Sequence, residues 1–256
     1  MTVPDLSLPV ADSALVARLS PSPNFGVRRG RRGIDMIVLH YTGCPSAEAE
    51  ELWMCSPQSQ VSAHYLVEED GAIVQLVAEK ARAWHAGVAF WAGEEDVNSR
   101  SIGIEIQNAG HGRGAPPPYP AAQVRAVVAL VADIVRRHGI SPVRVVGHSD
   151  VAPARKADPG EHFPWEALAA AGLALPMPEV ALPPAAPLGR AGVRAMQEAL
   201  ACIGYGVPIS GEACARTRAV VRAFRRRFLP QEVSDVPCAR VLAQARAVAA
   251  MVEEAG

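Results

Sequence analysis

Three short stretches of this 256-residue chain carry side chains that could do chemistry. His40 ends the apolar run IDMIVLHY, and His148 follows the apolar run PVRVV. Asp158 lies ten residues beyond His148, across a loop broken by prolines. A lone histidine at a strand end is more often a hydrogen-bonded core residue. Two imidazoles and a carboxylate, however, are a ligand set for a catalytic Zn²⁺ that keeps a fourth position for water. We expect the three to converge on a metal, although spacing alone also fits a two-histidine, one-carboxylate iron site.

Two further ionisable residues accompany this set. In the run SIGIEIQN, Ile102, Ile104 and Ile106 point to one face of a strand, and Glu105 points to the other. An unpaired charge in a buried strand costs several kcal/mol, so Glu105 either faces solvent or has a chemical role. Beside a metal, Glu105 could act as the general base and Lys156 as the cation that faces a developing oxyanion. These residues together predict metal-assisted hydrolysis, without naming the bond that is cut.

Apolar runs of strand length alternate with helical stretches through the first two thirds of the chain. The runs IDMIVLHY, SAHYLVEE, AIVQLV, SIGIEIQ and VRVVGH predict strands, and AAQVRAVVALVADIVRRHG predicts a helix. Continuous Ile, Val and Leu runs are typical of strands that are covered on both faces. We therefore expect an α/β domain over residues 22–173, with a mixed central β-sheet flanked by helices. Residues 1–21 would form an N-terminal extension.

The pattern changes after residue 173. Residues 174–187 contain five prolines, a density that prevents both helix and central strand. This segment predicts an extended, semi-stiff linker. Beyond it, residues 188–256 show only helical periodicity, which predicts a small, separate three-helix domain. Its expected core positions recur at spacings of three and four: Val193, Met196, Leu200, Val221, Phe224, Phe228, Leu242, Ala245 and Val248.

Composition and charge exclude several classes of protein. Half of the residues are hydrophobic and the formal net charge is −1, so the chain lacks the basic excess typical of nucleic-acid binders. No apolar run is long enough to span a membrane, and the first residues show no signal-peptide pattern. Five cysteines without a CxxC pair predict reduced thiols. We expect a cytoplasmic monomer, or a periplasmic protein if an upstream signal is missing from this chain.

Five stretches together resemble the zinc-dependent type-2 N-acetylmuramoyl-L-alanine amidases. In chain order they are MIVLHYTG, VSAHYLVEEDGAIVQLV, RAWHAGV, NSRSIGIEIQN and GHSDVAPARKADPG. The resemblance implies a fold shared with phage lysozymes of the amidase type. It also implies Zn²⁺-dependent hydrolysis of the amide between N-acetylmuramic acid, or its 1,6-anhydro form, and L-alanine in peptidoglycan fragments during cell-wall recycling. By the same resemblance, His40, His148 and Asp158 match the metal ligands, Glu105 the catalytic glutamate and Lys156 the catalytic lysine.

Four more residues are candidates for contact with a muropeptide. His85 matches a family position that lines the substrate cleft, and Trp84 beside it could stack on a sugar ring. Asn98 could contact substrate or cap a turn. Arg155 could meet the carboxylates of the peptide or be an ordinary loop arginine. His64, inside a predicted strand, is expected to be a packed histidine.

The C-terminal region also has a family resemblance. The stretches GVRAMQEALACIGYGVPISG and TRAVVRAFRRRF resemble the small helical peptidoglycan-binding domains found beside many cell-wall hydrolases. Cys214 stands where that pattern has an aspartate ahead of Thr217, so an expected helix cap is lost. Arg225 replaces a glutamine of the pattern. The resemblance therefore implies the helical fold more than glycan binding, and we expect the run 225–227 to form a solvated helix face.

Two other classes of function stay open. A recognition protein of the same fold would bind muropeptides without cutting them. Such proteins typically lose a ligand or the catalytic acid, whereas all five positions are present here. A non-haem iron oxygenase would use a tight His-x-Asp pair, which His148 and Asp150 imitate. The order of the α/β elements argues against this last class.

Overall fold

The computed structural model describes residues 6–30, 32–112 and 114–255. Its strands are β1 (Arg18–Leu19), β2 (Phe25–Val27), β3 (Met36–Tyr41), β4 (Tyr65–Val67), β5 (Ile73–Gln75), β6 (Ala81–Ala83), β7 (Ser101–Ile106) and β8 (Val145–Gly147). Its helices are α1 (Ala47–Met54), α2 (Val97–Arg100), α3 (Ala121–His138), α4 (His148–Val151), α5 (Trp165–Ala170), α6 (Arg190–Ile203), α7 (Ala215–Phe228) and α8 (Ala239–Glu254), with 3-10 turns η1 (Pro142–Arg144) and η2 (Pro230–Glu232).

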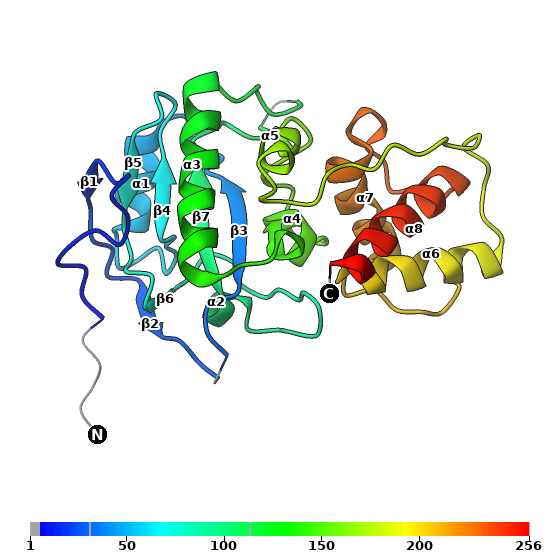
Figure 1. Ribbon diagram of the computed structural model, residues 1–256, viewed down its shortest axis with the longest axis horizontal. Helices are drawn as coiled ribbons and strands as arrows, with labels where there is room; N and C mark the ends of the chain where they lie inside the picture. Colours follow the sequence, from blue (N-terminus) through cyan, green and yellow to red (C-terminus); the bar gives the residue numbers. More distant parts are fainter. Residues whose placement is uncertain (1–5, 31, 113, 256) are drawn as a thin grey trace.

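Six strands form one mixed sheet in the order β1-β5-β4-β7-β3-β8. The neighbours β4, β7, β3 and β8 are parallel, whereas β4 and β5 are antiparallel. Strands β2 and β6 form a separate antiparallel pair. Helix α3 lies across one face of the sheet (Figure 1), and α1 and the C-terminal helices pack on the other. The expected mixed sheet flanked by helices is confirmed.

The long helix α3 is the apolar partner of one sheet face. Its buried positions Val127, Leu130, Val131 and Ile134 recur at helical spacing and pack on the strand residues that alternate inward. The helix ends at Gly139, whose φ of +66° is the left-handed conformation that favours glycine. The apolar residues of β7 face α3, which leaves the opposite face of that strand free for Glu105.

The predicted N-terminal extension belongs in part to the sheet. Residues 1–5 lie outside the described residues, but Arg18 and Leu19 form β1 and pair in parallel with β5. Further upstream, a carboxylate oxygen of Asp12 accepts hydrogen bonds from the Gln75 side chain at 2.5 Å and from the backbone N–H of Glu79 at 2.8 Å. From residue 12 onward the extension is thus bound to the α/β domain and covers one edge of its sheet.

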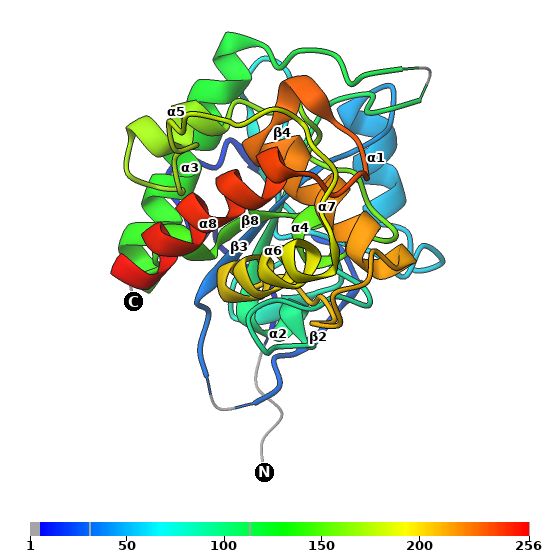
Figure 2. The ribbon, with the colours of Figure 1, turned by 90° about the vertical axis from the view of Figure 1, so that its right-hand side faces the viewer.

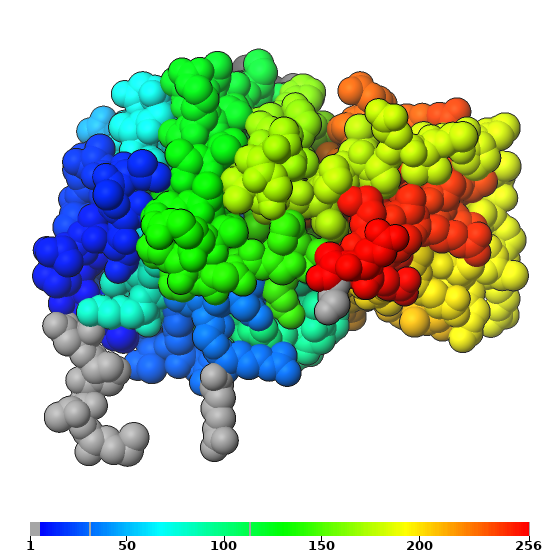
Figure 3. All heavy atoms as spheres, in the orientation of Figure 1, coloured from blue at the N-terminus to red at the C-terminus, as the bar shows by residue number. Residues whose placement is uncertain are grey.

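All three predicted C-terminal helices are present, as α6, α7 and α8, but they are packed against the first domain. One hydrophobic cluster runs without a break from Met36, Val38 and Val146 of the sheet to Met196 and Phe224 of the helices. Figure 3 shows the two regions in contact along one side. The two regions pack together because that face of β3 and β8 is apolar and would otherwise meet water.

The proline-rich segment 174–187 is extended, as expected, but it is bound along much of its length. The backbone N–H of Ala239 donates to the Ala186 carbonyl at 2.9 Å, and Gln244 donates to the Pro178 carbonyl at 3.2 Å. Figure 2 shows the segment running across the helical region. It therefore acts as a strap on the C-terminal helices and not as a flexible spacer.

Two details of the C-terminal helices bear on the sequence predictions. Cys214 is the N-cap residue of α7 and forms no capping hydrogen bond, in line with the lost cap; its Sγ atom lies 3.4 Å from the Thr217 hydroxyl group. The predicted solvated face at residues 225–227 is wrong, because Arg225 and Arg227 are only 4% and 7% exposed. Arg225 donates to the carbonyl oxygens of Glu232 and Val236, while Arg227 donates to the Val145 carbonyl of the first domain.

Among the described residues, no helix combines the length and apolar character needed to cross a membrane.

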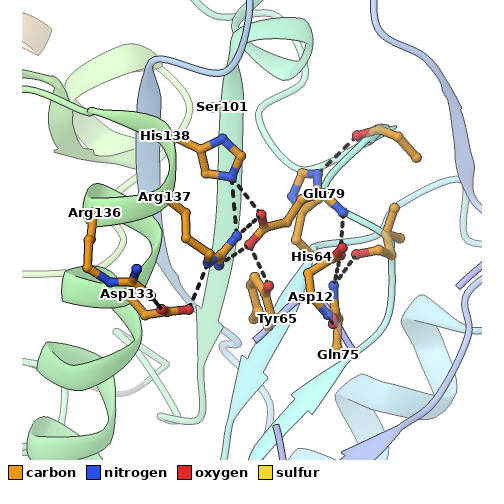
Figure 4. A network of polar contacts seen from close by, with 12 residues as sticks. Asp12, His64, Tyr65, Gln75, Glu79, Ser101, Asp133, Arg136, Arg137 and His138 are labelled. Atoms are coloured by element: carbon orange, nitrogen blue, oxygen red, sulfur yellow. Dashed lines mark hydrogen bonds and ion pairs between the residues drawn. The ribbon is translucent and has the colours of Figure 1, made fainter. Parts of the chain in front are cut away.

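A buried charge network joins α3 to the turn between β5 and β6 (Figure 4). The carboxylate of Glu79 accepts hydrogen bonds from Tyr65 at 2.5 Å, from His138 at 2.6 Å and from Arg137. Burial by itself would raise the pKa of Glu79, but the hydrogen bonds from Arg137, His138 and Tyr65 outweigh burial and lower it. The ionised carboxylate therefore stabilises the fold at neutral pH.

We expect Glu79→Gln to lower the free energy of unfolding by about 3 kcal/mol at pH 7, because the half-buried Arg137 guanidinium loses its counter-charge. The stabilisation from a lowered carboxyl pKa is fully present above the ordinary value of 4.5 and is lost as pH falls toward the folded value. The difference between wild type and variant should therefore narrow below pH 4.5, which urea unfolding at several pH values would measure. Glu198→Gln, at an exposed ion pair, is the control. An equal difference at every pH would contradict the role given to the Glu79 charge.

Candidate metal centre and substrate cleft

Three parallel strands bring site residues to one level at the same edge of the sheet. His40 pairs with Glu105 between β3 and β7, and Leu39 pairs with Gly147 at the end of β8. His148 follows directly as the first residue of α4. Because paired residues of neighbouring strands project to the same face, His40 and Glu105 point together into the space beside His148.

The loop after α4 folds back and returns Asp158 to this point, as the sequence predicts. The backbone N–H of Ser149 donates to the Asp158 carbonyl at 2.8 Å. A side chain on Gly147 would place its Cβ 2.6 Å from a ring carbon of Pro159, so the return requires glycine there. The ten-residue spacing between His148 and Asp158 is therefore closed by tight backbone packing.

The three predicted ligand atoms form a nearly equilateral triangle. The Nδ1 atoms of His40 and His148 lie 2.9 Å apart, and Oδ2 of Asp158 lies 3.1 and 3.0 Å from them. All three residues are buried, and they form a group that could hold a metal ion. A tetrahedral Zn²⁺ with bonds of ~2.0–2.1 Å holds its donors ~3.3 Å apart, so the triangle has the right size.

The charges of these residues also fit a cation. Burial, followed by repulsion from His148, lowers the pKa of His40 to about 4, so its imidazole is neutral at neutral pH. Burial alone would raise the pKa of Asp158, but its interactions with His148, and after them those with His40, outweigh burial and lower that pKa. A neutral imidazole nitrogen and a carboxylate are the forms that bind Zn²⁺. Acceptor atoms held this close to one another are stabilised by a cation among them.

Hydrogen bonds behind the triangle select the tautomer of each histidine. Nε2 of His148 donates to the Ala86 carbonyl at 3.1 Å, which leaves Nδ1 with its lone pair toward the triangle. Nε2 of His40 lies 3.1 Å from Nδ1 of His85, and with a free Nδ1 on His40 the proton sits on Nε2. Outer partners of this kind orient metal-binding histidines and raise their basicity.

The chain behind His40 continues through three residues with consistent donors. His85 accepts from His40 and donates through Nε2 to the Ser101 hydroxyl at 3.1 Å. Ser101 then donates to the Val97 carbonyl at 2.7 Å. Burial, followed by repulsion from His40, holds the pKa of His85 well below its ordinary value, so the ring stays neutral. His85 thus acts on the site through His40, in addition to its place in the cleft wall.

Glu105 lies beside the triangle without belonging to it. Its Oε1 atom is 3.9 Å from Nδ1 of His40, and its Oε2 atom is buried without a hydrogen-bond partner in the described part of the chain. Burial, with repulsion from Glu50 and Asp158, raises the pKa of Glu105 well above its ordinary value, and Lys156 opposes the rise. In the metal-free protein this carboxyl group therefore holds a proton readily, which suits a group that must accept one and pass it on.

A cleft of about 400 Å³ opens over these residues. Of the four predicted substrate contacts, Trp84 and His85 line it, and Lys156 does as well. Several further wall residues were not predicted from the sequence, because nothing local marks them. These additional lining residues are Tyr41, Thr42, Cys44, Glu50, Trp53, Met54, Val61 and Ser62.

Asn98 and Arg155 lie outside the lining of the cleft and hold its rear wall. The side-chain oxygen of Asn98 accepts hydrogen bonds from the backbone N–H groups of His85 and Ala86 at 3.2 and 2.8 Å. Arg155 donates to the carbonyls of Ala86 and Val88 at 3.0 and 2.6 Å. These hydrogen bonds give both residues a supporting role, and their contact with substrate stays a prediction. His64 is fully buried, as expected.

Gly103 explains how His85 fits against β7. A Cβ at position 103 would lie 2.4 Å from Cγ of His85, so only glycine leaves room for the imidazole.

We expect Gly103→Ala to displace His85 and to weaken Zn²⁺ binding by about tenfold or more, as loss of outer hydrogen-bond partners of metal ligands does in other metal sites. Competition with a chromophoric chelator would measure this. Gly26→Ala in β2, where the new Cβ would meet only Nε1 of Trp84 at 3.8 Å, is the matched control. Equal zinc affinity in both variants would contradict the role of His85.

A family model described as N-acetylmuramoyl-L-alanine amidase matches residues 29–161, more than half of the chain. The chain belongs to this amidase family. All three metal-ligand candidates, Glu105 and Lys156 lie within the matched residues, whereas the C-terminal helices lie outside them.

Individual amidases are similar to different lengths of the chain. The N-acetylmuramoyl-L-alanine amidase AmiD of Escherichia coli is 40% identical over 151 residues, which is 55% of this chain and only 54% of AmiD. The 1,6-anhydro-N-acetylmuramyl-L-alanine amidase AmpD of Haemophilus influenzae is 34% identical over 163 residues, which is 57% of this chain and 86% of AmpD. A solved structure of E. coli AmiD with anhydro-N-acetylmuramic acid-L-Ala-D-gamma-Glu-L-Lys has a TM-score of 0.76, at 32% identity. It covers 88% of this chain and 92% of its own, so the likeness extends into the C-terminal helices.

Proposed function

We propose that this amidase hydrolyses the bond between N-acetylmuramic acid, or its 1,6-anhydro form, and L-alanine of peptidoglycan fragments, as an enzyme of cell-wall recycling. The observation that carries the proposal is the convergence of His40, His148 and Asp158 beside the carboxyl group of Glu105, at the base of the cleft. The substrate named with the AmiD structure, an anhydro-muramyl peptide, supports the substrate class.

Each residue then has a defined task. His40, His148 and Asp158 would hold Zn²⁺, which supplies polarisation of the scissile carbonyl and a lowered pKa for a water molecule. Glu105 accepts the proton of the attacking water at a carboxylate oxygen and delivers it to the leaving amine nitrogen of L-alanine. Lys156 lies in the cleft wall, where its ammonium group balances negative charge on the carbonyl oxygen in the transition state.

The walls of the cleft suit a sugar joined to a peptide. Trp84 and Trp53 lie in the lining, and the flat face of an indole ring is a surface on which a sugar ring can stack. Trp53 is 53% exposed and lies ready for contact at the rim. The volume of about 400 Å³ is in the range of sites for small organic ligands. These features favour a single muramyl unit with its stem peptide.

The compartment is proposed on the chemistry of the thiols. All five cysteines are free in the structure, although a secreted domain commonly pairs its cysteines. Free thiols favour the reducing cytoplasm, where anhydro-muropeptides would be recycled. Cell fractionation with an antibody against the native protein would test this placement, and recovery with the periplasmic fraction would overturn it.

The decisive experiment uses an anhydro-muramyl tripeptide as substrate. Purified protein is incubated with it, with and without a chelator, and the products are identified by mass spectrometry. We expect free peptide and free sugar, no release after chelation, and recovery with Zn²⁺ but not with Fe²⁺. Recovery with Fe²⁺ alone would favour the iron centre. Intact substrate that nevertheless raises the melting temperature would show a recognition protein in place of an enzyme.

A further inference from the structure

Asp150 lies two residues after His148 in α4 and is 1% exposed. Its Oδ2 atom accepts a hydrogen bond from the backbone N–H of Gly147 at 2.8 Å, directly before His148 in the chain. One hydrogen bond does not compensate for burial of a carboxylate, so Asp150 needs further partners. Whatever holds Asp150 in place also holds the backbone from which His148 projects.

The further partners of Asp150 come from the C-terminal helices. The hydroxyl group of Tyr205, just after α6, donates to Oδ1 of Asp150 at 2.5 Å. Arg227, in the last turn of α7, places a guanidinium nitrogen 3.5 Å from Oδ2 and donates to the Val145 carbonyl at 3.1 Å. The Arg227 guanidinium also lies 3.9 Å from the ring centroid of Trp165. The helices thus supply both a hydrogen-bond donor and a cation to the loop of the metal centre.

These contacts are held in a dry environment. Tyr205 is 2% exposed, and its ring packs edge-on against Trp91 and Phe224. Burial, together with the charge of Asp150, keeps the pKa of Tyr205 well above its ordinary value, so the hydroxyl group remains a donor. A charged pair in such surroundings is costly to break, because the remaining partner stays buried without compensation.

A second set of contacts leads from the same turn of α7 toward the cleft. Arg226 lies 3.8 Å from the Glu161 carboxylate, which is 2.9 Å from Nε2 of His111. Nδ1 of His111 is 2.9 Å from the hydroxyl group of Tyr41, a residue of the cleft wall. The last turn of α7 therefore reaches both the metal-binding loop and the cleft wall.

None of the described residues that line the cleft comes from the C-terminal helices, since the lining ends at Asp158. These helices can influence the chemistry only through the residues of the first domain that they contact. We propose that Tyr205 and Arg227 are positioning residues of the metal centre, which act through Asp150 on the backbone at His148. This inference rests on the proposed function, because it takes His148 as a ligand of Zn²⁺.

The test measures zinc affinity, by chelator competition, in full-length variants. Tyr205→Phe keeps the ring packing and removes only the bond to Asp150, and we expect it to raise the Kd for Zn²⁺ about tenfold. Arg227→Met should have a similar effect, and Arg227→Lys should restore most of the affinity. The visible absorption bands of the Co²⁺-substituted protein should shift in Tyr205→Phe, because the geometry at His148 changes.

Tyr65→Phe is the matched control, because it removes a buried tyrosine hydroxyl that donates to a carboxylate at the same 2.5 Å, on the other side of the sheet. We expect it to lower thermal stability with no change in zinc affinity or Co²⁺ spectrum. Equal zinc affinity in Tyr205→Phe and wild type, or an equal loss in Tyr65→Phe, would overturn this inference alone. A wild-type protein that binds no zinc would overturn the proposed function as well.

Discussion

Glu105→Gln is expected to lower kcat for anhydro-muramyl peptide hydrolysis by about 10³-fold, because a correctly placed general base contributes roughly 10²–10⁴-fold. The amide side chain has the same shape as the carboxyl group but cannot accept and return a proton. Bound zinc should stay at the wild-type level, since Glu105 is outside the triangle of ligand atoms. Steady-state kinetics combined with elemental analysis of the purified variant would measure both quantities. A near-normal rate would remove Glu105 as the base, and loss of zinc would make it a ligand.

The same variant should be more stable than wild type when the metal is removed. A carboxyl group whose folded pKa is raised contributes stability below its ordinary value of 4.5, and that stability is lost as pH rises toward the folded value. At pH 8 the buried Glu105 charge therefore destabilises the metal-free protein, and glutamine removes this cost. Thermal unfolding in the presence of chelator at pH 5 and pH 8 should show the larger gain for Glu105→Gln at pH 8. A gain that is independent of pH would contradict the charge argument.

His148→Ala is expected to weaken zinc binding strongly and to lose activity together with the metal. The apparent binding energy of structural Zn²⁺ is ~10–16 kcal/mol over about four ligands, so loss of one ligand should weaken binding by about 10²–10³-fold. The Asp158 carboxylate, which is 7% exposed, would also lose its partner at 3.0 Å. Zinc content after dialysis and hydrolysis rate should fall in parallel. His162→Ala, at a histidine that contacts the Pro116 carbonyl away from the triangle, should retain both. Full zinc content in His148→Ala would contradict the assigned ligand set.

The candidate site could be predicted from sequence where its signal is local. His40 lies near the end of one apolar strand, His148 follows another, and Asp158 lies in a loop with prolines. Residue type and position together therefore indicate a site at the end of the strands. The alternation around Glu105 likewise shows which face of β7 the carboxyl group occupies. The roles of Asn98 and Arg155 could not be predicted in this way, because a polar side chain in a loop gives no sign of which backbone groups it will bind.

For the C-terminal helices, too, the local structure could be predicted from the sequence and the packing partner could not. Their periodicity is a property of neighbouring residues, so Val193, Met196 and Leu200 predict a buried stripe before any partner is known. What that stripe packs against is a different question. The proline-rich segment suggested that the C-terminal helices are separate from the α/β domain. It could not show that the face of β3 and β8 opposite α3 is apolar and that the helices can pack against it.

The sequence by itself predicted the types of element, the candidate ligand set and the candidate base, because strand alternation, helical spacing and donor chemistry are local. Only the tertiary structure decided that His40 and His148, 108 residues apart, place their Nδ1 atoms at 2.9 Å, and that His85 stands behind His40. It alone brought Arg227 to Asp150, across 77 residues. Such contacts arise because burying apolar faces of sheet and helix brings distant segments together, and the polar groups carried with them must then find partners.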